Sequence, residues 1–553
     1  MPANLTVTII NAGEATIPHG TTLFELSREY AHVCKRPILV AKVDNELTDL
    51  SRPVLYNSTI EFLDITDPNG FRAYQRSVSF MMVYAVKAIL GKKTRVVIAH
   101  SINKNFYCEL PELKTPLTDA LLAEIEQFMQ DTVAKDLPIE RLSLPRETAI
   151  KISEDLGLDD KVHLLRYRHS HTVSSYKLGW LYNYFYGEIA PTTGRLDSFK
   201  LTPHAGGFML QFPSVAHSYN LEDLSPQNRL TEVFTENKQW VRIMKTDTVG
   251  ALNDKLCAEG SAEIIRVAEA LHEKKVASLA DQIMDGGHTI VLIAGPTSSG
   301  KTSLAYRLGV QLRVNGATPH IMSLDNYYLD REFCPRDEFG NYDFETIRAI
   351  DTDLISENLQ GLLNGEEVQI PTFNFLTGKR EYKGNKLKFT SRDVLIMEGI
   401  HGLNELTSRG VPESDKFKIF ISALTQINID DHNRIPTSDL RMLRRIVRDF
   451  RTRGASAAIT ISMWPSVQRG EAKYIYPCQE LADAFYNSAL VYEMGVLKQY
   501  AEPLLFGIEQ HEPEYTEARR LIKLLASFLS IPSETIPQNS ILREFVGGSS
   551  FYK

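Results

Sequence analysis

The sequence predicts a multidomain protein that joins α+β modules to an α/β domain built on a parallel sheet. Three observations support this fold class. The chain has 553 residues, which is too long for one hydrophobic core, so about three or four domains are expected. Short strands and helices are mixed through the first 220 residues. From His288 onwards, apolar strands alternate with helices, which is the order found in parallel sheets.

Composition narrows the classes of protein to which the chain can belong. The net charge of −8 argues against a globally basic nucleic-acid binder, although it is compatible with a local basic patch. The five cysteines include no C-x-x-C pair, so neither a disulfide framework nor a thiolate zinc site is indicated. The N-terminus lacks a signal-peptide pattern, and no apolar run approaches the roughly 18 residues needed to span a bilayer. We therefore expect a cytoplasmic protein without membrane contact.

Hydrophobic patterns predict the elements of the first half in chain order. The expected strands are Leu5–Ile10, Ile38–Val43 and Ile60–Leu63, with a helix over Thr22–Tyr30. Helical periodicity follows around Ser77–Leu90 and Asp119–Asp136. Residues 221–285 look mainly helical and are expected to connect the two halves.

The clearest motif is the stretch Gly295–Thr302, which matches G-x-x-x-x-G-K-[ST] at every fixed position. It follows the apolar run Thr289–Ala294 and opens a helix predicted over Thr302–Leu312. A glycine-rich turn that matched the motif by chance would not need a strand before it and a helix after it. Backbone N–H groups of such a loop face nucleotide phosphates. The predicted nucleotide-binding residues are Gly295, Pro296, Thr297, Ser298, Ser299, Gly300, Lys301, Thr302 and Ser303, with Lys301 reaching the β- and γ-phosphates and Thr302 binding Mg²⁺.

Two acidic residues follow apolar strands and indicate phosphoryl transfer. Asp325 ends the strand near His320–Leu324, where a base that orients an acceptor hydroxyl belongs, although a turn or helix-cap aspartate would look alike. Glu398 ends the apolar run that begins at Asp393 and precedes Gly399, an arrangement suited to holding Mg²⁺.

An amphipathic helix is predicted over residues 440–453. Its apolar stripe runs parallel to a basic stripe that contains Arg441, Arg444, Arg448 and Arg451. Four arginines on one face repel each other unless an anion lies opposite, and guanidinium groups suit phosphate oxygens. A lid that closes over ATP would supply that anion. A solvated or intramolecularly paired face is the alternative, since Asp439 and Asp449 are near.

These motifs together resemble the uridine kinase/phosphoribulokinase family, across about residues 286–500. The motifs occur in that family's order: the loop Gly295–Thr302, Ser323–Tyr328, Tyr342–Phe344, Pro371–Arg380, Met397–Ile400 and Arg441–Gly454. The resemblance implies that Asp325 is the base on the acceptor hydroxyl and that the helix with Arg444 and Arg448 is the lid. It also implies substrate contacts by Asp325, Tyr327, Asp343, Phe373, Arg380 and Arg445, with Asp343 near the ribose hydroxyls.

One position departs from that family's pattern. Uridine–cytidine kinases carry a histidine that helps to read the pyrimidine, and the matching position here is Gly378. A glycine has no side chain with which to make that contact, so the base contact is lost or supplied elsewhere. A nucleoside remains the expected acceptor, and its base is left open.

The first 220 residues resemble the N-terminal part of threonyl-tRNA synthetase. Residues 5–66, with Ala41–Pro53, look like a TGS domain, a small β-grasp fold. The stretches Asn105–Tyr107, Asp136–Glu140 and Thr193–Thr202 look like the synthetase's editing domain. The aminoacylation core of the synthetase has no counterpart here, so a tRNA ligase is not expected.

The editing-like domain is predicted to be degenerate. The positions of its usual His-x-x-x-His and Cys-x-x-x-His motifs hold Arg76, Phe80, Phe185 and Ile189, which cannot form a zinc site. The pair His169 and His171 shares one face of a strand but has no carboxylate or thiol near it in sequence. A binding, regulatory or structural role is therefore expected, without zinc and without hydrolysis.

The sequence thus predicts an ATP-dependent, Mg²⁺-requiring kinase that phosphorylates the 5′-hydroxyl of a nucleoside, with Lys301, Asp325, Arg444 and Arg448 as catalytic residues. A kinase of another small acceptor, such as a sugar phosphate, and an RNA-binding regulator whose loop only senses nucleotide remain open. An RNA or small-ligand regulator bound at the N-terminal half, and a homo-oligomer, are also left open. The predicted domains are a TGS-like module at 1–66, an editing-like domain at 67–220, a helical connector at 221–285, the kinase domain at 286–510 and a C-terminal helical extension at 511–553.

Overall fold

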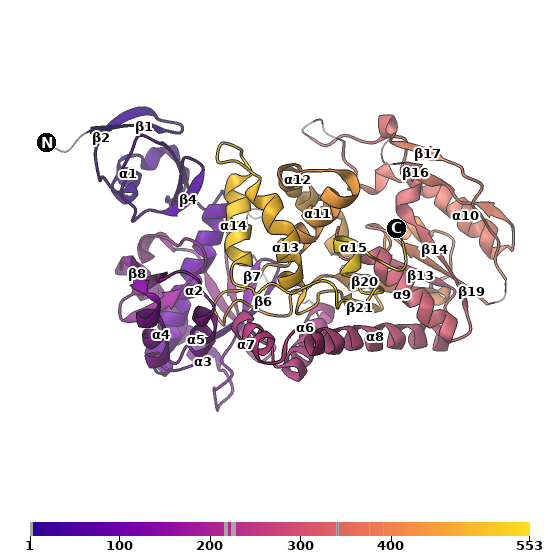
Figure 1. Ribbon diagram of the computed structural model, residues 1–553, viewed down its shortest axis with the longest axis horizontal. Helices are drawn as coiled ribbons and strands as arrows, with labels where there is room; N and C mark the ends of the chain where they lie inside the picture. Colours follow the sequence, from indigo (N-terminus) through magenta and orange to yellow (C-terminus); the bar gives the residue numbers. More distant parts are fainter. Residues whose placement is uncertain are drawn as a thin grey trace.

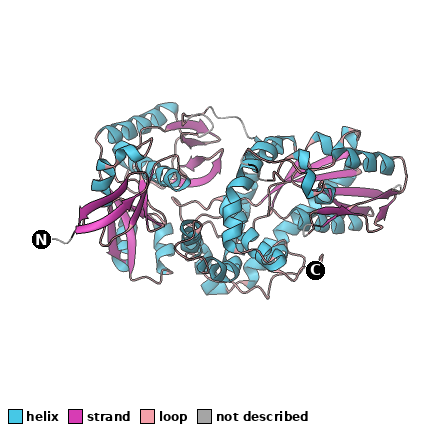
Figure 2. Ribbon diagram, turned by 90° about the horizontal axis from the view of Figure 1, so that it is seen from above, coloured by secondary structure: helices cyan, strands magenta, loops and turns pink. Residues whose placement is uncertain are grey.

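A computed structural model of the chain describes residues 4–214, 219–222, 228–338, 340, 342–374, 377–390 and 392–552. Residues 375 and 376 of the Pro371–Arg380 motif, and 223–227 at the start of the predicted connector, lie outside these ranges. The molecule is elongated, with the N-terminal modules at one end and the P-loop domain at the other (Figure 1). Viewed from above, strands gather towards both ends and helices occupy the region between them (Figure 2).

The first module is a five-stranded mixed sheet in the order β2-β1-β5-β3-β4, with one helix, as the predicted β-grasp requires. The elements are β1 (Asn4–Ile9), β2 (Gly13–Pro18), α1 (Leu23–Glu29), β3 (Val40–Val43), β4 (Glu46–Asp49) and β5 (Thr59–Leu63). Thr22 and Glu25 form a reciprocal cap that starts α1. Asp44 and Asn45, both with positive φ, make the two-residue turn between β3 and β4.

The second module combines the long helix α2 (Pro68–Leu90) with two antiparallel sheets, in the orders β11-β12-β7-β6 and β10-β9-β8. Its strands are β6 (Val97–Ile102), β7 (Asn105–Glu109), β8 (Ile139–Pro145), β9 (Thr172–Leu178), β10 (Leu181–Tyr184), β11 (Lys200–His204) and β12 (Gly207–Gln211). Its shorter helices are α3 (Asp119–Ala134), α4 (Arg146–Asp155) and α5 (Asp159–Arg166). The three helices α6 (Asn228–Met244), α7 (Val249–Glu259) and α8 (Ala262–Asp285) follow and lead to the second half.

A five-stranded parallel sheet organises the second half, which confirms the predicted fold class. The strand order is β14-β19-β13-β20-β21, from β13 (Ile290–Ala294), β14 (Thr318–Ser323), β19 (Asp393–Glu398), β20 (Lys416–Ser422) and β21 (Ala484–Asn487). The central strand β13 is buried along its whole length, as its unbroken apolar run predicts. Two small antiparallel pairs, β15 (Val368–Gln369) with β18 (Lys386–Leu387) and β16 (Thr372–Asn374) with β17 (Lys379–Glu381), lie outside the sheet.

Alternate residues of β13 send side chains into two different cores. Ile290 and Leu292 join the cluster that contains α10 (Thr352–Leu363). Val291 and Ile293 join the cluster that contains α9 (Lys301–Val314). Because side chains alternate along a strand, the sheet is covered on both faces, and its carboxyl edge is left for a site.

Helices at the carboxyl end of the chain pack beside this sheet. They are α11 (Thr437–Arg453), α12 (Ala457–Gly470), α13 (Glu493–Phe506), α14 (Tyr515–Leu525) and α15 (Arg543–Val546). The last of them, α15, lies next to α9 (Figure 1). Within the described residues, no helix combines the length and the apolar character that a membrane crossing needs.

Candidate active site

The phosphate loop runs from the end of β13 to the start of α9, as predicted. Gly295 lies so close to β20 that a Cβ there would be 2.1 Å from the carbonyl oxygen of Ile421. Gly300 has φ +90°, a left-handed conformation that side chains rarely adopt. Both glycines are therefore required by the backbone path that turns the loop into the helix.

The two polar side chains at the start of α9 face the loop and the neighbouring strand. The Lys301 ammonium donates to the carbonyl oxygens of Gly295 at 3.1 Å and Pro296 at 3.2 Å. Thr302 Oγ1 lies 3.3 Å from Glu398 Oε1 at the end of β19. The lysine predicted to bind phosphate and the two predicted metal ligands thus lie together at the carboxyl edge of the sheet.

Asp325 follows β14, and Glu398 ends the neighbouring strand β19, where it pairs with Ser323. Burial raises the pKa of Asp325, while the positive charges of Lys301, Arg448 and Arg453 oppose that shift. Burial, reinforced by the charge of Asp325, raises the pKa of Glu398 to about 7. The two carboxylates repel each other in a poorly solvated space, and a cation bound between them would offset this repulsion.

Sequence reasoning missed two polar residues beside this edge. Burial raises the pKa of Glu345 to about 7, with the charge of Glu471 adding to the shift, and Glu345 Oε2 is buried without a partner among the described residues. His401, three residues after Glu398, is 2% exposed, and its ring nitrogens also lack a partner within the described part of the chain. Burial lowers the pKa of His401 to about 4. His401 directly follows the predicted Met397–Ile400 motif, but no spacing rule singles out either residue.

Helix α11 lies behind the phosphate loop and carries the predicted arginines. Arg441 donates to Glu471 Oε2 at 2.7 Å and to the carbonyl oxygen of Thr297 at 3.1 Å. Glu471 in turn accepts the N–H of Thr297 at 3.2 Å. Arg441 and Glu471 therefore hold both backbone polar groups of Thr297.

Arg444, predicted as catalytic, is fully buried in the same region. It donates to Glu493 Oε2 at 2.7 Å and reaches the carbonyl oxygens of Ser298 at 3.3 Å and Ser299 at 3.4 Å. The anion opposite Arg444 is thus a glutamate of the protein itself, and the guanidinium supports the loop from behind. A role in contacting phosphate stays a prediction.

The other arginines of the predicted lid lie nearer the surface of α11. Arg445 Nε donates to Asp449 at 3.1 Å, and Arg448 Nη2 lies 2.9 Å from the same carboxylate. The charges of Arg448, Arg453 and Arg445 hold the pKa of Asp449 below its usual range. The paired-face alternative considered for this helix therefore describes part of what is observed.

Most of the predicted substrate residues lie in the segment between β14 and β19. The hydroxyl of the buried Tyr327 accepts a hydrogen bond from Asn358 at 2.9 Å. Arg380 pairs with Asp351 at 2.8 Å. Phe373 packs against Tyr328 with ring centroids 5.7 Å apart. Asp343 is only partly buried, and its Oδ1 accepts the N–H of Glu345 at 3.1 Å.

At the position where a pyrimidine-reading histidine was expected, Gly378 has φ +69°, and a Cβ there would lie 2.8 Å from Nε of Arg331. The backbone N–H of Arg331 donates to the carbonyl oxygen of Gly378 at 2.8 Å. The guanidinium of Arg331 thus lies where a side chain at 378 would begin.

The four replaced positions of the editing-like module lie in or beside one core. Phe80 and Phe185 pack edge to face with centroids 5.4 Å apart, and Ile189 belongs to the same buried cluster. The Arg76 guanidinium is close to Gly187 and lies 5.8 Å from the Tyr186 ring. Three of the four positions therefore carry buried apolar side chains, and the fourth carries a guanidinium.

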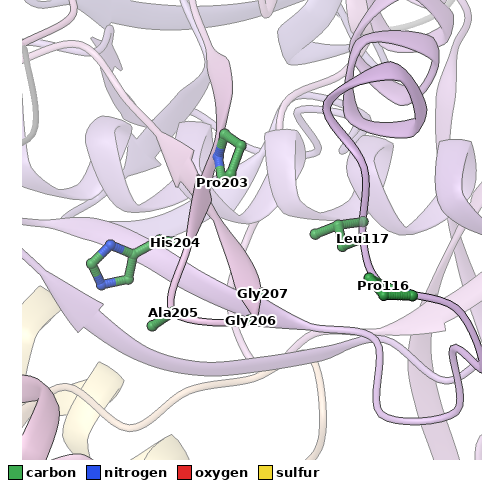
Figure 3. Close-up of a pocket in the computed structure, with 7 residues that line it drawn as sticks. All are labelled: Pro116, Leu117, Pro203, His204, Ala205, Gly206 and Gly207. Atoms are coloured by element: carbon green, nitrogen blue, oxygen red, sulfur yellow. The ribbon is translucent and has the colours of Figure 1, made fainter.

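A shallow groove of about 340 Å³ lies in the same module, between the β11–β12 hairpin and the segment before α3 (Figure 3). Figure 3 shows Pro116 and Leu117 on one side and the hairpin residues on the other, with the ring of His204 directed away from Leu117. Its lining is thus mostly apolar or backbone, and it belongs to elements other than those of the phosphate loop.

Comparison with known proteins identifies the second half of the chain. Residues 290–491 match the sequence model of the phosphoribulokinase/uridine kinase family. A uridine kinase of Staphylococcus haemolyticus is 30% identical over 196 residues, which cover 35% of this chain and 85% of that enzyme. The chain belongs to the phosphoribulokinase/uridine kinase family. The matched residues 290–491 therefore form a kinase domain of this family.

The first half matches a different class of protein. A threonine–tRNA ligase of Syntrophotalea carbinolica is 30% identical over 173 residues, which cover 31% of this chain and 27% of the ligase. The chain therefore spans about a quarter to a third of the length of the ligases that it matches. Both predicted resemblances are confirmed.

Among solved structures, one described as a possible uridine kinase from Bacillus stearothermophilus covers 39% of this chain and 98% of its own, at 17% identity and a TM-score of 0.27. That score is too low to support a conclusion.

Proposed function

We propose that the chain transfers the γ-phosphate of ATP to the 5′-hydroxyl of a nucleoside. The observation that supports this most is the neighbourhood of Asp325. Its carboxylate lies within the electrostatic influence of Lys301 and Arg448 at the edge of the sheet where the phosphate loop begins. A hydroxyl held between Asp325 and the loop can give its proton to the carboxylate as its oxygen attacks phosphorus.

The charged groups of the site have separate roles in this proposal. Lys301 binds the β- and γ-phosphate oxygens, which requires it to leave the carbonyl oxygens of the loop. Arg441 and Arg444 keep the loop in place, so that its N–H groups are fixed before the nucleotide arrives. Arg448, which is partly exposed, and Arg445 beside it can exchange Asp449 for a phosphate oxygen.

Thr302 and Glu398 fit Mg²⁺, because both offer oxygen ligands and their oxygens are 3.3 Å apart. When bound, Mg²⁺ neutralises the charge of the phosphates. Thr302 supplies a hydroxyl and Glu398 a carboxylate, on adjacent elements. A cation bound beside Glu398 would lower its raised pKa, so that the carboxyl group is ionised.

The base of the acceptor is the open part of the proposal. The guanidinium of Arg331 lies beside Gly378, which supports the proposal that its N–H groups take the role of the histidine of uridine–cytidine kinases. Donors of this kind suit carbonyl oxygens or ring nitrogens of a nucleobase. We therefore propose that the acceptor is a nucleoside whose base is recognised by other contacts than those of uridine–cytidine kinases. The base itself can be a pyrimidine or a different one.

A substrate screen tests this function. The full-length protein with Mg·ATP is given uridine, cytidine, adenosine, guanosine, inosine and a set of sugar phosphates, and ADP release is measured. We expect turnover with at least one nucleoside and none with Lys301→Ala, which lacks the fixed cation of the loop. If only sugar phosphates are phosphorylated, the nucleoside acceptor is wrong and the acceptor is a sugar phosphate. Turnover by a folded Lys301→Ala protein would overturn the role of the loop.

A second candidate, RNA binding by the first half, rests on its likeness to threonine–tRNA ligases over 173 residues. In this alternative the N-terminal modules bind RNA and the phosphate loop senses nucleotide. Retention of a labelled tRNA by the full-length protein, without turnover of any small acceptor, would favour it over the kinase.

A further inference from the structure

Glu544 brings a carboxylate from the far end of the chain to the first turn of the phosphate-loop helix. Ser303 Oγ donates to Glu544 Oε2 at 2.7 Å and lies 2.7 Å from the hydroxyl oxygen of Tyr552. Ser303 is the third residue of α9, and the N-terminal turn of that helix is where a nucleotide phosphate binds. A protein carboxylate thus already occupies an anion position next to the loop.

A positive charge of the predicted lid lies near Glu544. Arg448 Nη1 of the predicted lid lies 4.0 Å from Glu544 Oε1. The carboxylate therefore lies between the first turn of α9 and the predicted lid helix, where we expect a phosphate of ATP to bind.

The segment that carries Glu544 is anchored firmly. Ile541, Leu542 and Phe545 are each at most 1% exposed and belong to the large core of the kinase domain. From α11, Arg451 donates to the carbonyl oxygens of Glu544 at 2.9 Å and Phe545 at 3.2 Å. Only the side chain of Glu544, and not its backbone, is therefore free to change its contacts at low cost.

The residues after α15 are attached less tightly. Gly547 and Gly548 both have positive φ, and beyond them Phe551 stacks on Tyr306 of α9 with centroids 5.6 Å apart. Tyr552, which is only partly buried, shares the hydroxyl of Ser303 with Glu544. Figure 1 shows this stretch passing beside α9. Its contacts with α9 are made by ring surfaces and one hydrogen bond, which a ligand can replace.

We propose that Glu544 is an intramolecular competitor of ATP: its carboxylate holds Ser303 in place of a nucleotide phosphate and withdraws when Mg·ATP binds. The apparent affinity for ATP is then reduced by the fraction of molecules in which Glu544 is engaged. The proposal rests on nucleotide binding by the phosphate loop, as in the proposed function, but not on any acceptor.

The test measures nucleotide binding directly, in the full-length protein. Glu544→Gln keeps the shape and a hydrogen-bond acceptor but removes the charge, and hydrogen bonds to charged groups are about twice as strong as neutral ones. We expect the Kd for Mg·ATP, measured by isothermal titration calorimetry, to fall roughly three- to tenfold, since tenfold corresponds to about 1.4 kcal/mol. Glu534→Gln, at an exposed glutamate earlier in the same stretch, is the matched control and leaves the Kd unchanged.

A second variant makes the result independent of one substitution. Tyr552→Phe removes only the hydroxyl that contacts Ser303, and we expect a smaller change of Kd in the same direction. If Glu544→Gln binds Mg·ATP more weakly than the unsubstituted protein, the carboxylate completes the nucleotide site. If both variants bind Mg·ATP with the Kd of the unsubstituted protein, the carboxylate does not compete. Either result overturns the proposal. Absence of Mg·ATP binding in all of these proteins would overturn the proposed function as well.

Discussion

Replacing Arg444 tests whether this residue supports the phosphate loop or contacts the nucleotide. Its guanidinium is 0% exposed and donates to Glu493, which is itself 0% exposed. Arg444→Met would leave the carboxylate of Glu493 buried and uncompensated. Removing one partner of a buried ion pair costs about 3–5 kcal/mol, so we expect a loss of that size in the free energy of unfolding.

The assay is urea unfolding of the full-length protein, followed by circular dichroism. The double variant Arg444→Met/Glu493→Gln removes the orphaned charge and should recover about 1–3 kcal/mol of the loss, because the two residues are in direct contact. Arg453→Met, at an exposed arginine on the same helix, is the control, and it should cost at most about 1 kcal/mol.

A different result would refute this reasoning. If Arg444→Met left the unfolding midpoint unchanged and lowered only turnover, Arg444 would act on the nucleotide as part of a lid. The buried contacts with Ser298 and Ser299 would then describe only the nucleotide-free arrangement.

Three further predictions test other parts of the site. Asp325→Asn cannot accept a proton, so turnover measured by ADP release should fall by roughly 10²–10⁴ while calorimetry still detects ATP binding; a change of only a few-fold would make Asp325 structural. Burial raises the pKa of Glu345 to about 7, so the folded state holds that proton more tightly than the unfolded state. The free energy of unfolding should therefore decrease as pH rises from about 4.5 to about 7, and Glu345→Gln should flatten this dependence in urea unfolding at pH 5 and pH 8. Lys161→Met should cost about 3–5 kcal/mol in the same assay by leaving Asp430 unpaired, and a loss below about 1 kcal/mol would show that this pair does not hold the two halves together.

The parts of the fold that were predictable are those with a local pattern. The phosphate loop is specified within eight neighbouring residues, and its strand and helix follow from unbroken apolar runs and 3.6-residue periodicity. Strands β2 and β4 were not predicted, because Gly13–Pro18 and Glu46–Asp49 carry few buried side chains and resemble turns in composition. These strands form because pairing with β1 and β3 satisfies their backbone, which is a tertiary effect.

The support of the site could not be predicted from local patterns. Glu471 comes 174 residues after Thr297 and reaches it from the segment that follows α12, and nothing in its own neighbourhood marks it. The basic stripe of α11 correctly indicated that anions lie opposite. It could not show that glutamates at 471 and 493 supply part of that charge, because their spacing from the helix depends on how α12 and α13 fold back.

Ion pairs between residues far apart in sequence also join the two halves of the molecule. Lys161 of the second module is 1% exposed and lies 2.7 Å from Asp430, which is 0% exposed and belongs to the stretch just before α11. Asp431, next in that stretch, accepts from Arg95 at 2.7 Å. Either half alone would present these charges unpaired, and a buried charge without its partner is strongly unfavourable. The N-terminal half is therefore part of the structure that positions α11, and through Arg441 it is connected to the phosphate loop.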